Sequence, residues 1–235
     1  DCLPAKLGRL GWTSISMVPV PSSFFSAGRA YVRFGFDRSI FIDQIDTSDL
    51  DDSFVSAQSL LEQLLAKDKE LLAAQRPFLS YTFLVSGHFP YPLNEARRPK
   101  LVHVAPHEPM VEDYVNTVYY NTLAVGQYIA AVRKLDPTAL IVTLGDHPPV
   151  LNLEQPSTDY PGQARLTHQV PLLIFDGQQG ELPLTGWVPD YQIPEIILDK
   201  MTNGSFCRAN KCYEDAAQSI RPTATGLTVI DAGTK

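Results

Sequence analysis

Short apolar runs alternate along this chain with stretches whose apolar residues recur at helical spacing, and this alternation constrains the fold more than any other feature. The apolar runs have the length of strands and occupy residues 13–18, 39–43, 78–85, 139–144 and 170–175. Helical patterns occupy residues 3–10, 22–31, 110–135 and 193–201. Strands that alternate with helices usually form a parallel sheet with helices on both faces. The pattern therefore predicts an α/β fold, a three-layer α/β/α domain with a mainly parallel sheet.

The composition fits one globular domain. A chain of 235 residues, of which 44% are hydrophobic, can bury one substantial core, so we expect a single domain over residues 1–235. Its 19 basic and 26 acidic residues give a formal net charge of −7. Because nucleic-acid binding usually needs a basic face, we expect no nucleic acid partner. No apolar run approaches the roughly 20 residues that a membrane-spanning helix needs.

The three cysteines bear on the compartment in which the protein works. Cys207 and Cys212 lie close together in the polar segment CRANKC, which suits a small disulfide loop and an oxidising compartment. Two free surface thiols are the alternative. The paired spacing of a zinc site is absent. Cys2 then has no internal cysteine to pair with, which suggests a partner before residue 1.

Two polar side chains close the most apolar of the predicted strands, residues 139–144. Asp146 and His147 follow it, and Pro148 and Pro149 then prevent the chain from continuing as helix or strand. In open α/β sheets, ligands bind beyond the carboxyl ends of the strands. A carboxylate beside an imidazole can hold a divalent cation there. The same pair can also serve as a cap or as a hydrogen-bonding loop.

A second predicted strand delivers a polar side chain in the same way. Residues 78–85 lead into SGHFPYP, which places His88 after the strand. Because the carboxyl ends of parallel strands meet at one edge of a sheet, we expect His88, Asp146 and His147 to share that edge.

An acidic cluster opens another helical pattern. Asp51, Asp52 and Ser53 precede a stretch whose apolar residues fall at helical spacing from Phe54 to Leu65. Carboxylates and serine are favoured at the amino end of a helix, where they accept hydrogen bonds from unpaired backbone amides. We therefore interpret the cluster as a helix start and give it no catalytic role.

Residues 114–151, YVNTVYYNTLAVGQYIAAVRKLDPTALIVTLGDHPPVL, resemble the alkaline phosphatase superfamily. The resemblance is to its sulfatase-like branch, which includes lipoteichoic acid synthase and related phosphoglycerol or phosphoethanolamine transferases. Three further segments agree in the same order: CLPAKLGRLGW, TFLVSGHFPYP, and HQVPLLIF with DYQIPEIILDKM. The resemblance implies an alkaline-phosphatase-like fold. It also implies that the chain is the C-terminal portion of a larger extracytoplasmic domain, with the N-terminal part missing.

The resemblance assigns roles to three of these side chains. In the family, a metal-bound threonine or serine attacks a phosphate ester, and the metal neutralises charge on the phosphoryl oxygens. Asp146 and His147 would be ligands of one divalent metal ion, with Mn, Mg and Zn all open. His88 would bind the substrate phosphate. The nucleophile would lie upstream of residue 1, so this fragment is expected to be catalytically incomplete.

Several positions depart from the family pattern. Val18 stands where relatives often carry a histidine, Ala27 where they carry an arginine, and Asn121 where many carry an aspartate. Arg29 could bind substrate in place of the arginine if the helix is shifted. A solvated surface arginine is the alternative reading.

Two functions follow from these observations. The first is a metal-dependent phosphoryl-type transferase or hydrolase that acts on a cell-envelope lipid headgroup or glycan. It would work at the periplasmic or extracellular face of the cytoplasmic membrane, held by an N-terminal membrane anchor outside this sequence. The second is a non-catalytic sulfatase-like envelope module that binds a lipid or glycan, motivated by Val18 and Ala27.

Overall fold

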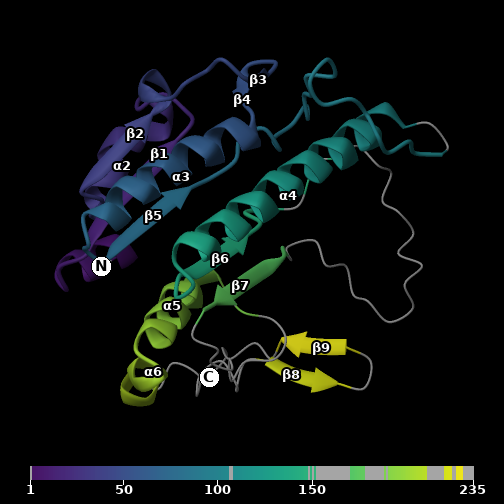
Figure 1. The fold of residues 1–235 in the computed structure, drawn as a ribbon. Helices are drawn as coiled ribbons and strands as arrows, with labels where there is room; N and C mark the ends of the chain where they lie inside the picture. The colour runs from purple at the N-terminus through teal and green to yellow at the C-terminus, as the bar shows by residue number, and fades with distance from the viewer. Residues whose placement is uncertain are drawn as a thin grey trace. The chain divides into compact units, whose positions relative to one another are not determined.

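The computed structural model of the protein describes residues 2–105, 108–147, 149, 151, 170–177, 188, 190–210, 220–223 and 226–229. They fall into two compact units, which we describe separately (Figure 1). Unit 1 comprises Asp1–Asp136 and Pro149–Leu151, and unit 2 comprises Pro137–Pro148 and Asn152–Lys235. No helix within the described ranges has the length and apolar character needed to cross a membrane.

A parallel three-stranded sheet forms the centre of unit 1. Strand β1 (Thr13–Val18) lies between β2 (Arg38–Phe41) and β5 (Phe78–Thr82), and both neighbours run parallel to it. The register pairs Met17 of β1 with Ile40 of β2. Residues of β1 are almost all buried, as expected of a central strand covered on both faces. The predicted parallel sheet is therefore confirmed for this unit.

Helices cover both faces of this sheet, which confirms the α/β/α arrangement. On one face lies α2 (Ala27–Phe34), with α1 (Leu3–Gly8) beside it. On the other face lies α3 (Ala57–Ala73), and α4 (Pro109–Leu135) packs along α3. The short 3-10 turns are η1 (Phe24–Ser26) before α2 and η2 (Ile42–Gln44) after β2.

The main core of unit 1 lies between the sheet and α3. Met17 and Ile40 of the strands belong to one cluster with Leu60 and Leu64 of α3 and Ala124 of α4, and none of the five is more than 5% exposed. Full burial of a leucine side chain stabilises a fold by about 1.5–3 kcal/mol. This cluster therefore fixes α3 and α4 against the sheet and, with them, the loops that the strands lead into.

Aromatic packing fixes α2 on the opposite face. The ring of Tyr31 lies 5.5 Å from that of Phe36, 6.2 Å from that of Phe41 and 6.1 Å from that of Tyr81. Burial raises the pKa of the Tyr31 hydroxyl. The side of α2 that carries Tyr31 therefore faces the sheet.

The interpretation of the acidic cluster as a helix start is wrong. Helix α3 begins at Ala57, and its cap is Ser56, whose side chain accepts a hydrogen bond from the Ser59 amide at 3.1 Å. The cluster instead forms a small antiparallel hairpin of β3 (Leu50–Asp51) and β4 (Phe54–Val55). Ser56 supplies the cap locally, so the acidic residues are not needed for it.

The start of α2 also differs from the prediction. The helix was expected over residues 22–31, but it spans Ala27–Phe34 and follows Ser26. Phe25 and Ser26 have left-handed backbone angles, with φ of 44° and 58°. A helix cannot continue through such residues, so the first turn is delayed.

Unit 2 contains an antiparallel pair of strands. Strand β6 (Leu140–Leu144) pairs antiparallel with β7 (Leu172–Asp176). Among the described strands, the parallel pairs are those of β1 with β2 and with β5, which belong to unit 1. Strands β6 and β7 lie within two residues of their predicted limits. Helix α5 spans Ile193–Met201, as predicted. The remaining elements are η3 (Asp190–Gln192), α6 (Ser205–Asn210), β8 (Ile220–Thr223) and β9 (Gly226–Val229).

The cysteines support part of the disulfide prediction. Cys207 is disulfide-bonded, and Cys2 is a free, exposed cysteine. Cys212 lies outside the described residues. The pairing of Cys207 with Cys212 therefore stays a prediction.

Candidate functional site

The turn after β6 places Asp146 and His147 side by side. Asp146 Oδ1 accepts a hydrogen bond from the His147 amide at 2.9 Å, and Asp146 Oδ2 lies 3.5 Å from His147 Nε2. The side chains are 88% and 54% exposed, respectively. The Gly145 amide donates to the Pro171 carbonyl at 3.0 Å, and a Cβ at Gly145 would lie 2.9 Å from the Val170 side chain. Glycine therefore permits the close approach that fixes this turn.

The two side chains carry donor atoms suited to a divalent metal. An imidazole nitrogen and a carboxylate oxygen suit Zn²⁺ or Mn²⁺, whereas Mg²⁺ prefers oxygen ligands. A metal site in a protein usually has three or four protein ligands. In the part of the chain that the structure describes, no group of three or more His, Cys, Asp or Glu residues could hold a metal ion. Asp146 and His147 thus fit part of a metal site, and their metal role stays a prediction.

The turn after β5 is held by helix α4. Ser86 is fully buried, and its hydroxyl donates to Asn121 Oδ1 at 3.0 Å. A Cβ on Gly87 would lie 3.0 Å from Asn121 Nδ2, which is closer than most side chains tolerate. The small residues before His88 therefore allow α4 to approach the turn and fix it.

His88 itself projects from this turn as an exposed side chain. Its Nδ1 lies 2.9 Å from the Phe89 carbonyl oxygen, and its ring packs edge-on against Phe54 with centroids 6.5 Å apart. A carbonyl oxygen only accepts, so Nδ1 must carry the hydrogen in this bond. Nε2 can then donate to an anion only when the ring is protonated. A charge-assisted bond of this kind is the strong type that binds phosphate.

The loop beyond His88 is fixed by further contacts with α4. The Thr117 hydroxyl lies 3.2 Å from the carbonyl oxygen of Tyr91, which is 2% exposed. Asn116, which is fully buried, accepts from the amides of Leu101 and Val102 at 2.7 and 3.0 Å and donates to the Val102 carbonyl at 2.8 Å. These bonds satisfy polar groups that would otherwise be costly to bury.

A buried ion-pair cluster, which the sequence analysis missed, ties the same loop to the β3–β4 hairpin. Arg98 Nε donates to Asp51 Oδ1 at 2.8 Å, and the rest of its guanidinium pairs with Asp49 at 2.9 and 3.0 Å. The side chains of Arg98 and Asp51 are only 8% and 4% exposed. The bonds from Arg98 lower the pKa of the Asp49 carboxyl to about 2. The acidic residues before α3 were the sequence feature that could have indicated this cluster, but their partner Arg98 lies 47 residues from Asp51.

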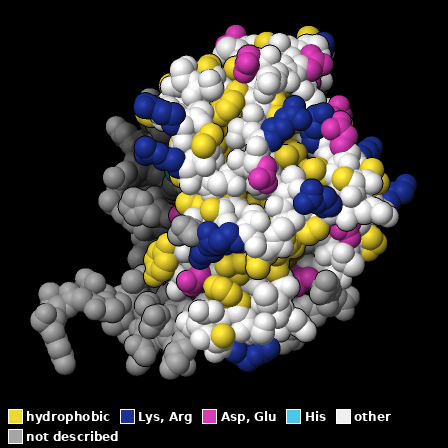
Figure 2. All heavy atoms as spheres, turned by 90° about the vertical axis from the view of Figure 1, so that its left-hand side faces the viewer, with side chains coloured by type: hydrophobic (Ala, Val, Ile, Leu, Met, Phe, Trp, Pro, Cys, Tyr) yellow, Lys and Arg dark blue, Asp and Glu magenta, His cyan; other side chains and the backbone are white. Residues whose placement is uncertain are grey.

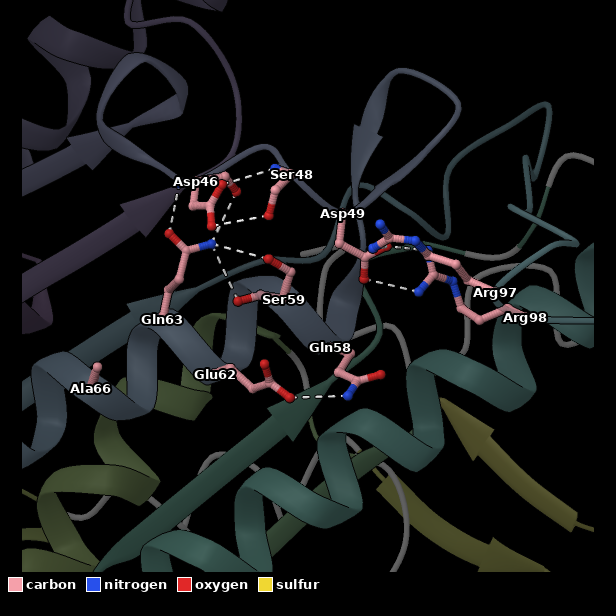
Figure 3. A pocket seen from close by; sticks show the side chains of 10 residues that line it. All are labelled: Asp46, Ser48, Asp49, Gln58, Ser59, Glu62, Gln63, Ala66, Arg97 and Arg98. Atoms are coloured by element: carbon pink, nitrogen blue, oxygen red, sulfur yellow. Dashed lines mark hydrogen bonds and ion pairs between the residues drawn. The ribbon is translucent and has the colours of Figure 1, made fainter.

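A polar cavity of about 540 Å³ opens beside this cluster (Figure 3). Arg97 and Arg98 both point to Asp49 on one side of it, and Gln63 bonds to the Asp46 backbone. Because both guanidinium groups already pair with a carboxylate, the cavity is a poor site for an anion. Its lining consists of Asp46, Ser48, Asp49, Gln58, Ser59, Glu62, Gln63, Ala66, Arg97 and Arg98.

The remaining candidate residues lie on β1 and α2. Val18 is fully buried and Ala27 is 8% exposed, so apolar packing occupies the two positions where relatives were expected to carry histidine and arginine. Arg29 is exposed on α2, and its guanidinium bonds to the Ser26 hydroxyl at 3.3 Å. His88 and Arg29 belong to unit 1, whereas Asp146 and His147 belong to unit 2. A shared site for the four residues stays a prediction.

The chain matches known proteins over most of its length. The Sulfatase family model matches residues 1–181. A protein of Rhizobium meliloti named for cyclic beta-1,2-glucan modification is 23% identical over 186 residues, covering 72% of this chain and 28% of that protein. The chain therefore spans less than a third of the length of this relative.

Solved structures share the fold at low sequence identity. The lipoteichoic acid synthase LtaP from Listeria monocytogenes has a TM-score of 0.65 and 17% identity, over 73% of this chain and 45% of that chain. The C-terminal periplasmic domain of EptC from Escherichia coli, in complex with Zn, has a TM-score of 0.53 and 16% identity, over 72% and 50%. The phosphoglycerol transferase GacH from Streptococcus pyogenes, in complex with sn-glycerol-1-phosphate, has a TM-score of 0.52 and 14% identity, over 71% and 44%. These likenesses show a shared fold, and the family match over residues 1–181 shows that the chain belongs to the sulfatase family.

Proposed function

We propose that this chain is part of a metal-dependent phosphoryl-type transferase or hydrolase that acts on a cell-envelope lipid headgroup or glycan. The observation that carries the proposal is the exposed Asp146–His147 pair at the carboxyl end of β6, in a chain that belongs to the sulfatase family. Because β6 pairs antiparallel with β7 outside the parallel sheet, the support comes from the donor atoms and the family rather than from the sheet topology.

In this proposal, Asp146 and His147 hold the metal and His88 binds the phosphate. When bound, the metal would activate the nucleophile and neutralise charge on the phosphoryl oxygens. The protonated His88 ring would donate from Nε2 to a phosphoryl oxygen, while the Phe89 carbonyl fixes the ring through Nδ1. A serine or threonine nucleophile is expected outside these 235 residues. Arg29 is a candidate second donor to the substrate.

The substrate class is inferred from the proteins to which the chain is similar. Their names include a lipoteichoic acid synthase, a phosphoglycerol transferase and a protein of cyclic glucan modification. One of these names specifies phosphoglycerol transfer, so we infer that the substrate is a phosphate ester of an envelope lipid or glycan. We therefore place the protein at the periplasmic or extracellular face of the cytoplasmic membrane, with an anchor elsewhere in the protein. The disulfide bond of Cys207 supports an oxidising compartment.

A non-catalytic envelope module is the second candidate, favoured by the burial of Val18 and Ala27. Turnover of phosphatidylglycerol and phosphatidylethanolamine by the full-length protein separates the two. We expect release of diacylglycerol that a chelator abolishes and that Mn²⁺ or Zn²⁺ restores. Turnover that persists without metal would refute the metal-dependent reaction. A full-length protein that is inert with every donor, yet still binds the lipid or glycan, would support the module.

A further inference from the structure

We propose that the outer side of α2 is a docking surface for an anionic lipid membrane. The surface consists of Phe25, Arg29, Val32 and Arg33, and we call it the basic-aromatic face. The proposal goes beyond the reaction above, because these residues would hold the protein against a bilayer whether or not it turns over a substrate.

The basic-aromatic face points away from the sheet. Tyr31 occupies the inner side of α2, whereas Arg29, Val32 and Arg33 recur at spacings of three and four residues and are all exposed. Phe25 is 90% exposed and Val32 is 72% exposed. Figure 2 shows the left-hand side of Figure 1, where α2 lies, and basic side chains lie there next to hydrophobic ones.

The backbone before α2 holds Phe25 outward. Phe25 and Ser26 both adopt left-handed angles, which bulky side chains such as phenylalanine rarely adopt. The turn is tight, because the Gly28 amide donates to the Ser22 carbonyl at 2.8 Å and a Cβ on Gly28 would lie 3.3 Å from Ser22. Strained residues of this kind tend to occur at functional sites. Among the ring contacts of the described residues, the Phe25 ring meets only the edge of the neighbouring Phe24 ring, at 4.6 Å, and it stays 90% exposed, so a partner outside the fold could bury it.

Charge complementarity identifies that partner as anionic. Residues 24–38, which span η1, α2 and the start of β2, contain three basic residues and one acidic residue, in a chain whose net charge is −7. The single acidic residue, Asp37, is engaged in the sheet, where it accepts hydrogen bonds from the Ser14 amide at 2.7 Å and the Ser14 hydroxyl at 3.0 Å. Basic residues near a membrane surface are attracted to anionic headgroups.

The exposed apolar side chains favour a membrane over a soluble anionic polymer. Arg29 and Arg33 would suffice for a polymer, which offers no apolar phase. Phe25 and Val32 can enter the boundary between headgroups and acyl chains, while the arginine stems lie along it with their charged ends in the headgroup layer. The combination of aromatic, aliphatic and basic side chains on one helix side is typical of interfacial helices.

Co-sedimentation with vesicles tests the proposal. We expect the chain to bind vesicles of phosphatidylserine and phosphatidylcholine, whose headgroups are not those of the lipids tested for turnover above. It should bind pure phosphatidylcholine vesicles poorly and lose affinity for the mixed vesicles as salt rises. Arg29→Gln with Arg33→Gln should lower the affinity about tenfold or more. Phe25→Ser with Val32→Ser should also lower it, by about tenfold. All four side chains are exposed, so thermal unfolding should confirm that the variants remain folded.

A matched control removes the same charge elsewhere in unit 1. Lys69→Gln with Arg76→Gln removes two exposed basic side chains outside the basic-aromatic face and should change vesicle affinity less than about twofold. Equal binding to neutral and anionic vesicles, or an equal loss in the control, would overturn the proposal. Binding that soluble polyphosphate competes away, with no effect of Phe25→Ser, would point to an anionic polymer and also overturn it.

Discussion

After β5 the chain enters a loop that α4 and the β3–β4 hairpin hold at several points, whereas after β6 it enters a turn whose two polar side chains are open to solvent. Ser86 in the first loop is buried against Asn121, and Arg98 is buried against Asp51. In the second, the side chains of Asp146 and His147 are 88% and 54% exposed. In both segments a strand is followed by a glycine, a histidine and a proline, in that order.

His88 and His147 therefore differ in how firmly the surrounding structure holds them for their proposed roles. The backbone that carries His88 is fixed before any ligand binds, which favours a positioned hydrogen-bond donor. The Asp146–His147 pair has donor atoms but too few of them for a complete metal site. Its geometry should therefore depend on a ligand, while that of His88 should not.

The largest effect is expected from the open turn. If His147 holds the proposed metal in the full-length protein, His147→Ala should lower turnover by about 10⁴-fold or more, because the metal would both activate the nucleophile and stabilise the transition state. Steady-state assays with metal titration would measure the loss. His103→Ala is the control, since His103 is 75% exposed and lies near Glu112 in unit 1. Comparable losses in both variants would contradict the assignment.

Removing the fixed histidine should cost less. His88→Ala should lower turnover of the full-length protein by about 10²–10³-fold, as expected for one lost donor to a transferring group. Metal affinity, measured by calorimetry, should not change. A loss of metal binding in this variant would show that His88 is a ligand, and the contrast between the two turns would fail.

The fixed loop can be released by breaking its buried ion pair. Arg98→Ala leaves the carboxylate of Asp51 buried without its cation and should lower the free energy of unfolding by about 3–5 kcal/mol. Urea denaturation measures the change in the free energy of unfolding. Arg97→Ala is a matched control, because Arg97 pairs with the same Asp49 but is 56% exposed, and it should cost less than about 1 kcal/mol. Equal effects would mean that burial does not strengthen the cluster.

A smaller effect is expected at the contact between α4 and the Ser86 turn. Asn121→Ala leaves the buried Ser86 hydroxyl without its acceptor and should lower the free energy of unfolding by about 1–3 kcal/mol. Asn121→Asp keeps an acceptor oxygen at this position and should recover part of the loss. If Asn121→Ala unfolds at the same urea concentration as the unmodified chain, α4 does not hold this turn.

The smallest effect is the dependence of the ion-pair cluster on pH. The folded-state pKa of Asp49 is lowered from 3.8 to about 2, so its contribution is fully present above its unfolded pKa and is lost as pH falls through about 2. Because solvent screens this pair, the loss should stay well below the roughly 2 kcal/mol that the full pKa shift would give. Urea unfolding between these pH values should show a shallower pH dependence for Asp49→Asn than for the unmodified chain. Equal slopes would argue against the pairing.

The sequence by itself determined the order and kind of the main elements. The limits of β1 and α5 match the prediction, and α4 begins one residue earlier than expected. The sequence also predicted that the Asp146–His147 pair follows a strand, because a strand and its turn are consecutive residues. The strand predicted over residues 78–85 instead ends at Thr82, so His88 lies in the loop beyond β5 rather than at the strand end. The family resemblance rested on the same consecutive motifs.

Only the tertiary structure decided what holds those strand ends. The pairing of Arg98 with Asp51 spans 47 residues, and that of Ser86 with Asn121 spans 35. The tertiary structure also decided that Asp51 belongs to a hairpin. In the sequence, an acidic residue that caps a helix cannot be distinguished from one that pairs with a distant arginine. Local periodicity reports which face of an element is buried, but not which partner covers it. Contacts of high sequence separation form only when the packed core brings their elements together, and so they leave no local pattern to read.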